Sequence, residues 1–217
     1  MNRKSPHINK KVNLIAATNQ NCKISEQYRT IRTNFLSSID CVNSRTLIIT
    51  SPNSQEGKST TSANFAISLA LQGKKVLLID ANMRNPILDH SFKIGNTIGL
   101  SSVLNGRIRI EDTIGKTEIN GLDLLTSGPV PINPTELLGS QNMESLVETT
   151  VGLYDVVVFD TPPILEVSDA KILANLCDGL LLVIRSGKTK SAEAIKVKKL
   201  LKSSKSRLLG IILNDTD

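Results

Sequence analysis

The stretch Ser51-Pro52-Asn53-Ser54-Gln55-Glu56-Gly57-Lys58-Ser59-Thr60 follows a β-branched apolar run and precedes an alanine-rich helical segment. A strand-to-helix loop that ends in Gly-Lys-Ser-Thr is typical of sites that bind nucleotide phosphates. Its backbone N–H groups surround the phosphate oxygens, the Lys58 ammonium spans the β- and γ-phosphates, and the Ser59 hydroxyl is a ligand for Mg²⁺. The sequence therefore predicts a phosphate loop for ATP and Mg²⁺ made by Ser54, Gln55, Glu56, Gly57, Lys58, Ser59 and Thr60.

The loop departs from the strict phosphate-loop pattern at two positions. Pro52 stands where a Gly is expected five positions before Gly57, and Gln55 stands where such loops often carry Gly. The backbone can still surround phosphates with these residues in place. Because a side chain at Gln55 restricts φ, we expect it to weaken or reshape the site.

Two more strand-like runs end in carboxylates. Asp80 follows the apolar run 76–79, and Asp160 follows the apolar run 156–159. The carboxyl ends of neighbouring parallel strands lie at one edge of a sheet, so we expect both aspartates near the phosphate loop. Carboxylate and hydroxyl oxygens suit Mg²⁺, and the sequence therefore predicts a metal site made by Ser59, Asp80 and Asp160.

Strand-like and helix-like segments alternate from residue 45 onward, which is typical of a parallel sheet with helices on both faces. Strands are expected at 46–50, 75–80, 122–126, 155–160, 179–185 and 208–214. Helices are expected at 58–72, 133–149, 167–175 and 191–203, with short helices and loops over 89–120. The predicted fold class is α/β, a three-layer, doubly wound and mostly parallel sheet of the P-loop NTPase kind.

A further helix is expected over 25–35, ahead of the first strand, with Ser25 as its cap. An apolar stripe on this helix is made by Tyr28, Ile31 and Phe35. Glu26, Arg29 and Arg32 follow one another at intervals of three residues, so they lie along one side of the helix. An exposed helix with ordinary charge pairing is the alternative interpretation.

Composition narrows the class of protein. The chain has 217 residues, no Trp and only six Phe and Tyr, so a stacking surface for single-stranded nucleic acid is not expected. No apolar stretch approaches the roughly 20 residues of a membrane helix. Cys22, Cys41 and Cys177 lack metal-site spacing and indicate free thiols in a reducing cytosol. The net charge of +6 favours an ordinary solvated basic surface over a dedicated anionic partner.

In combination these motifs resemble the bacterial tyrosine kinases of the CpsD/CapB type, whose P-loop fold is related to that of MinD and ParA. The resemblance runs from about residue 25 to residue 214. The family's second Walker-A-like element is matched by Asp80-x-Asn82-x-Arg84, and its Walker B element by 156–160 with Thr161-Pro162-Pro163. The matching elements elsewhere are Glu26, Arg29 and Arg32 of the ring-forming motif, the segment 127–138, and Asn214, where relatives contact adenine.

The resemblance implies a cytoplasmic ATP-dependent protein-tyrosine kinase that regulates capsule or exopolysaccharide production. It implies catalytic roles for Lys58, Asp80, Arg84 and Asp160, with Asp80 orienting or deprotonating the tyrosine hydroxyl. The implied partners are protein-tyrosine substrates, further copies in a ring-shaped homo-oligomer, and a transmembrane chain-length regulator that holds the kinase at the inner face of the plasma membrane. On this basis residues 1–24 form a basic N-terminal extension and residues 25–217 the kinase domain.

Two departures from the family leave other functions open. Asn82 replaces the second aspartate of the motif. The family's usual tyrosine-rich tail does not appear in the sequence, whose two tyrosines are Tyr28 and Tyr154, so either the tail is lost, the chain is shortened, or the substrates are other proteins. Both features favour a nucleotide-dependent regulator of a membrane polysaccharide machine with little phosphotransfer. A positioning ATPase of the ParA/MinD type ranks third, because Asn53 stands where those proteins carry a lysine and no amphipathic C-terminal helix is seen.

Overall fold

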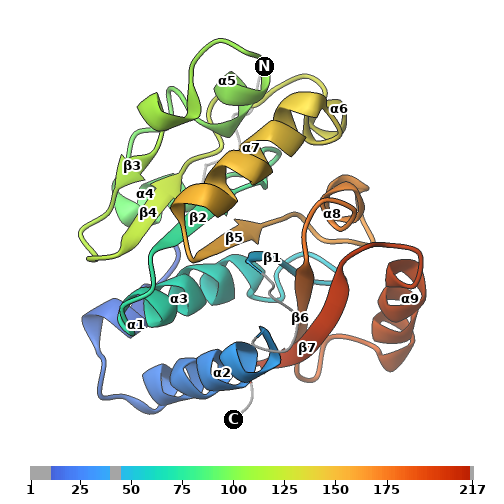
Figure 1. Cartoon of the computed structure of the whole chain (residues 1–217). Coiled ribbons are helices and arrows are strands. Elements are labelled where there is room, and N and C mark those ends of the chain that lie inside the picture. Colours follow the sequence, from blue (N-terminus) through green and yellow to red (C-terminus); the bar gives the residue numbers. More distant parts are fainter. Residues whose placement is uncertain (1–10, 40–44, 216–217) are drawn as a thin grey trace, which may run out of the picture.

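The fold is described from a computed structural model, which covers residues 11–39 and 45–215 (Figure 1). Cys41 and the basic residues Arg3, Lys4 and Lys10 lie outside the described residues. The strands are β1 Thr46–Thr50, β2 Val76–Asp80, β3 Gly115–Lys116, β4 Leu122–Leu125, β5 Val156–Asp160, β6 Gly179–Arg185 and β7 Arg207–Asn214. The helices are α1 Ile15–Thr18, α2 Lys23–Ile39, α3 Lys58–Ala70, α4 Leu88–Phe92, α5 Leu100–Leu104, the 3-10 turn η1 Ile110–Asp112, α6 Pro134–Leu138, α7 Gln141–Leu153, α8 Asp169–Leu173 and α9 Ser191–Leu201.

The seven strands form one sheet in the order β3-β4-β2-β5-β1-β6-β7. Every neighbouring pair is parallel except β3 and β4. β1 and β5 lie at the centre, and their carboxyl ends carry the phosphate loop and Asp160. The predicted fold class, a mostly parallel α/β sheet, is confirmed.

Helices cover both faces of this sheet, which produces two apolar cores. Figure 1 shows α3 on one side of the sheet, next to α1 and α2, and α7 on the other. Alternate residues of β1 enter different cores, with Leu47 on the α3 side and Ile48 on the α7 side. The rings of Phe35 and Phe65 join α2 to α3 edge to face, with centroids 5.2 Å apart.

Two sequence expectations about helices are wrong. The helix expected over 133–149 is broken into α6 and α7 at Gly139, and Ser140 takes an extended conformation before α7 begins. The Ser140 hydroxyl donates to the Leu137 carbonyl at 2.7 Å, which closes the end of α6. Ser25 does not cap α2, which begins at Lys23; its buried hydroxyl instead donates to the Asn19 carbonyl at 2.7 Å.

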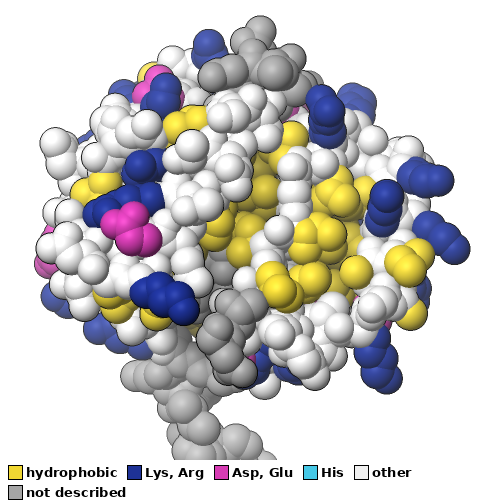
Figure 2. Space-filling view, turned by 90° about the horizontal axis from the view of Figure 1, so that it is seen from below, with side chains coloured by type: hydrophobic (Ala, Val, Ile, Leu, Met, Phe, Trp, Pro, Cys, Tyr) yellow, Lys and Arg dark blue, Asp and Glu magenta, His cyan; other side chains and the backbone are white. Residues whose placement is uncertain are grey.

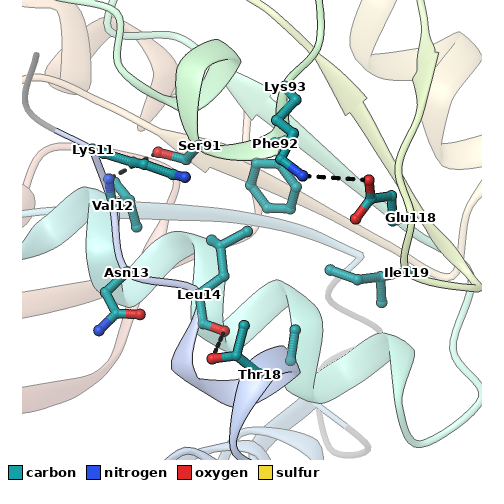
Figure 3. Close-up of a pocket in the computed structure, with 11 residues that line it drawn as sticks. Lys11, Val12, Asn13, Leu14, Thr18, Ser91, Phe92, Lys93, Glu118 and Ile119 are labelled. Atoms are coloured by element: carbon teal, nitrogen blue, oxygen red, sulfur yellow. Dashed lines mark hydrogen bonds and ion pairs between the residues drawn. The ribbon is translucent and has the colours of Figure 1, made fainter.

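Residues ahead of α2 pack against the helices α3 and α4. Val12 and Ala16 are buried, and the Ala16 N–H donates to the Asn64 side chain of α3 at 2.9 Å. A cavity of about 450 Å³ lies between this segment, α4 and the β3–β4 turn (Figure 3). Phe92 and Leu14 point into it. None of the predicted site residues lines this cavity. The predicted boundary between an N-terminal extension, residues 1–24, and a kinase domain, residues 25–217, stays a prediction.

The surface is apolar at one edge of the sheet. Ile211 and Leu213 of the edge strand β7 are 54% and 53% exposed, and Ile195 of α9 is 53% exposed. Figure 2 shows apolar side chains gathered on one face of the molecule with Lys and Arg side chains around them. No helix among the described residues is long and apolar enough to cross a membrane.

Candidate active site

The phosphate loop joins β1 to α3 and leaves a run of backbone donors free. The N–H groups of residues 55–60 make no hydrogen bond within the described part of the chain. The loop's shape depends on two left-handed residues, Gln55 at φ 62° and Gly57 at φ 89°. A Cβ at Gly57 would lie 2.1 Å from the Asn214 amide nitrogen, so only glycine fits there. Gln55 therefore takes the left-handed conformation although it carries a side chain, and the loop keeps its donors for an anion; whether Gln55 weakens or reshapes the site stays a prediction.

The Glu56 side chain is directed away from this run of donors. It is fully buried, accepts a hydrogen bond from the Asn53 N–H at 3.0 Å, and accepts another from the Thr189 hydroxyl at 2.5 Å. These bonds tie the loop to the connection between β6 and α9. The Glu56 carboxylate thus holds the loop in shape. Only the backbone N–H of Glu56 is left to contact a phosphate.

The carboxylate of Asp160 has one oxygen in use and one free. Oδ1 accepts a hydrogen bond from the Ser62 hydroxyl at 2.9 Å, while Oδ2 is buried without a partner among the described residues. The buried hydroxyl of Ser59 lies close to this carboxylate, yet it makes no well-aligned hydrogen bond with any described residue. Burial raises the pKa of Asp160, and the nearby Lys58 ammonium and Ser59 hydroxyl oppose that rise. Two unpartnered buried oxygens beside a phosphate loop fit the ligand set of Mg²⁺.

Asp80 lies beside Asp160 on the neighbouring strand. The two residues are register partners in the parallel pair β2–β5. One Asp80 oxygen accepts from the Asn82 N–H at 3.2 Å, and the other accepts from the N–H groups of Ile87 and Leu88 at 3.3 and 3.2 Å. Burial, and then the charge of Asp160, raises the pKa of Asp80. A bound cation would relieve the repulsion between these carboxylates.

The amide of Asn82 adds a further oxygen to the site. Its Nδ2 donates to the Asn85 carbonyl at 3.1 Å, which fixes the turn after β2. Its Oδ1 is buried and has no partner within the described residues. The position expected to carry a second aspartate thus presents a neutral acceptor close to Asp80.

Arg84 is held by residues that sequence reasoning did not single out as site residues. Its guanidinium donates to both oxygens of the fully buried Asp169 at 2.9 and 3.0 Å, and to the Thr135 hydroxyl at 2.8 Å. The Asp169 hydrogen bond raises the pKa of Arg84 further. Arg84 therefore ties the turn after β2 to α6 and α8, and its predicted catalytic role remains a prediction. Asp169 begins α8, and in the sequence alone an aspartate at that position indicates at most a helix cap and no contact with Arg84.

Residues at the ends of β6 and β7 and in the loop after β6 contact the phosphate loop. The Asn214 amide donates to the Glu56 carbonyl at 3.1 Å, and the Arg185 guanidinium donates to the Gln55 carbonyl at 3.4 Å. Lys188 donates to the Ser54 carbonyl at 3.1 Å. The structure thus brings Asn214 to the site, and it adds Arg185 and Lys188, which the sequence pattern did not single out as site residues.

The predicted oligomer motif lies on α2. Arg29 pairs with Glu26 and donates to the Gln20 carbonyl at 2.9 Å. Arg32 donates to the Ser68 carbonyl at 2.8 Å, and its buried Nε has no partner among the described residues. Both arginines line a surface hollow of about 260 Å³.

Comparisons with known proteins give one consistent family. Residues 44–206 match the model of the AAA domain. The chain is 50% identical over 203 residues to "Tyrosine-protein kinase YwqD" of Bacillus subtilis (strain 168), covering 93% of this chain and 85% of YwqD. The kinase domain of the Escherichia coli tyrosine kinase ETK superposes with a TM-score of 0.90 at 33% identity, covering 94% of this chain and 80% of that chain. MinD from Pyrococcus horikoshii in complex with Mg-ADP gives a TM-score of 0.68 at 26% identity, covering 78% and 69%.

Proposed function

Because this chain belongs to the bacterial tyrosine-protein kinases and carries their AAA domain, we propose that it transfers the γ-phosphate of ATP to tyrosine side chains of proteins. One observation carries the proposal. The buried pair Asp80 and Asp160 lies beside a phosphate loop whose backbone donors are unpaired. This arrangement supports binding of a polyphosphate together with a divalent cation.

Each residue has a defined task in this proposal. The N–H groups of residues 55–60 and the Lys58 ammonium bind and orient the phosphates. Ser59, Asp80 and Asp160 hold Mg²⁺, which when bound neutralises charge on the phosphates. Asp80 orients the tyrosine hydroxyl or accepts its proton. Asn214 contacts the adenine.

The proposal also covers the partner proteins of the kinase and its location in the cell. We propose that the kinase regulates capsule or exopolysaccharide production at the inner face of the plasma membrane, held there by a transmembrane chain-length regulator. The exposed apolar side chains of β7, Ile211 and Leu213, support contact with another polypeptide, since such edges are usually covered. Glu26, Arg29 and Arg32 are proposed to bind a neighbouring copy in a ring, and the hollow beside the two arginines supports this.

A nucleotide-dependent regulator with little phosphotransfer is the second candidate. The neutral amide of Asn82 beside Asp80 favours it, because an amide cannot accept a proton from a tyrosine hydroxyl. Both tyrosines of the chain are buried, so neither offers itself as an acceptor.

Phosphotransfer from γ-labelled ATP to a tyrosine peptide distinguishes the two candidates. We expect Mg²⁺-dependent phosphotyrosine from the parent chain and its collapse in Lys58→Met, because that change removes the ammonium that spans the phosphates. Lys202→Met, on the exposed surface after α9, is the matched control and should behave as the parent. ATP binding without phosphotyrosine would instead support the regulator. If Lys58→Met binds ATP and transfers phosphate as the parent does, the site assignment is wrong.

A further inference from the structure

One residue of the phosphate loop, Ser54, already donates hydrogen bonds to a carboxylate of the chain itself. Ser54 donates both its backbone N–H, at 2.6 Å, and its hydroxyl, at 2.5 Å, to one oxygen of the Glu166 carboxylate. The N–H groups of the following residues 55–60 have no partner in the described part of the chain. Glu166 therefore accepts hydrogen bonds at the start of the loop, from a site that otherwise suits a phosphate.

The backbone places Glu166 at this position. The residue lies six positions after Asp160, in the connection from β5 to α8. The N–H groups of Ile164 and Leu165 donate to the carbonyls of Ser51 and Pro52 at 2.9 and 3.3 Å, so this connection runs along the first residues of the loop. The Glu166 side chain itself is exposed. Its carboxylate is thus delivered to the loop by a fixed backbone yet remains free to rotate into water.

We propose that Glu166 sets the nucleotide preference of the site by competing with the terminal phosphate of ATP. This inference rests on the proposed function. Asp160 lies at the start of the same connection and is one of the residues that would hold Mg²⁺, which would neutralise charge on the β- and γ-phosphates, so Glu166 would face the terminal phosphate of a bound ATP. A carboxylate within several ångströms of an added phosphate weakens binding through like-charge repulsion, whereas ADP lacks that phosphate. Glu166 therefore disfavours ATP relative to ADP until its side chain leaves Ser54.

Glu166→Gln separates charge from hydrogen bonding, because the amide keeps an acceptor oxygen of the same reach. Titration calorimetry with Mg²⁺ present would measure ATP and ADP affinity for the parent and the variant. We expect the Kd for ATP to fall about three- to ten-fold and the Kd for ADP to change less than two-fold, with the ATP effect shrinking as salt rises. Glu148→Gln, on the exposed surface of α7, is the matched control and should change neither Kd.

Ser54→Ala provides a second variant, since it removes the hydroxyl donor and leaves the backbone N–H. We expect it to loosen Glu166 and strengthen ATP binding in the same direction, by less than Glu166→Gln does. Equal changes for ATP and ADP, or none in either variant, would overturn this inference while nucleotide binding by the parent upholds the site itself. Absence of nucleotide binding by parent and variant alike would overturn the proposed function and this inference together.

Discussion

Asp80 and Asp160 are register partners on the adjacent parallel strands β2 and β5, with exposed fractions of 1% and 0%. Two carboxylates buried side by side repel each other when ionised, and each is also penalised by the loss of water. The backbone N–H groups that bind Asp80 and the Ser62 hydroxyl that binds Asp160 offset part of that cost. A bound divalent cation would offset the rest, so this pair predicts metal dependence.

Asp160→Asn tests that dependence through stability. Without metal, we expect the variant to melt about 2–4 °C above the parent, because relief of roughly 1 kcal/mol of repulsion shifts Tm by that amount in a chain of this size. Added Mg²⁺ should raise the Tm of the parent and leave that of the variant unchanged. Thermal melts in EDTA and in MgCl₂ check both expectations. Asp112→Asn, at an exposed aspartate, is the control, and a Mg²⁺ response preserved in Asp160→Asn would contradict the metal assignment.

Asn82→Asp places a carboxylate where the resemblance of the motif implies a second aspartate. We expect tyrosine phosphorylation of an added peptide to rise about ten-fold, the usual scale for a lost carboxylate that supports a metal site, with ATP affinity unchanged. The same change removes the amide donor to the Asn85 carbonyl and adds a third buried charge, so the metal-free protein should melt at a lower temperature. Steady-state rates and melts of both proteins measure these effects. Equal rates would show that Asn82 is a neutral substitution.

Both tyrosines of the chain should resist ionisation in the folded state. Burial raises the pKa of Tyr28, and burial together with the hydrogen bond to Asp123 raises the pKa of Tyr154. The folded chain thus binds more protons than the unfolded chain above about pH 10, so stability falls as pH rises through that point. Ultraviolet absorbance of tyrosinate should appear near pH 10 only in denaturant. Tyrosinate forming near pH 10 in the native protein would contradict this burial and reopen self-phosphorylation.

Replacement of Arg29 and Arg32 together by Ala should shift the proposed ring to smaller species. Both guanidinium groups lie at one surface hollow, and across an interface each would lose carboxylate or carbonyl partners. Arg32→Ala alone also frees the Ser68 carbonyl within the chain, so melts must accompany the mass measurement. Light scattering measures the mass, with Arg109→Ala as the exposed control. An unchanged mass, or a monomer throughout, would rule out this interface.

The sequence predicted most of the fold because its strands are continuous apolar runs that end in carboxylates or turn residues. β1 and β6 were predicted at their observed bounds, and the positions of Lys58, Asp80 and Asp160 followed from the rule for parallel strand ends. The break between α6 and α7 was missed although the sequence marks it, because Gly139 ends α6 and Ser140 precedes α7, a local pattern for the end of one helix and the start of the next.

The contacts between distant segments could not be predicted. Asp169 binds Arg84 across 85 positions, and Glu166 binds Ser54 across 112, and no local pattern marks either pair. The sequence placed Glu56 in the phosphate loop as a backbone donor and indicated no partner for its carboxylate. Its partner Thr189 comes from another strand connection, so only the folded sheet shows that the carboxylate is enclosed.

In the proposed function, the paired carboxylates and the phosphate loop form one Mg²⁺-dependent site for phosphate transfer to tyrosine. Asp80→Asn is the variant to compare, because Asn keeps the shape and one acceptor oxygen while losing the charge and the base. Its amide group replaces an oxygen that accepts backbone N–H bonds, so melts of both proteins must show that the fold persists. Rates of phosphate transfer from labelled ATP to a tyrosine peptide would be compared with ATP affinity in the same preparations. We predict a fall in kcat of about 100-fold or more, the scale of a lost general base, with nucleotide binding retained. An unchanged kcat, or a parent chain that binds Mg²⁺ and ATP and transfers no phosphate, would contradict the account.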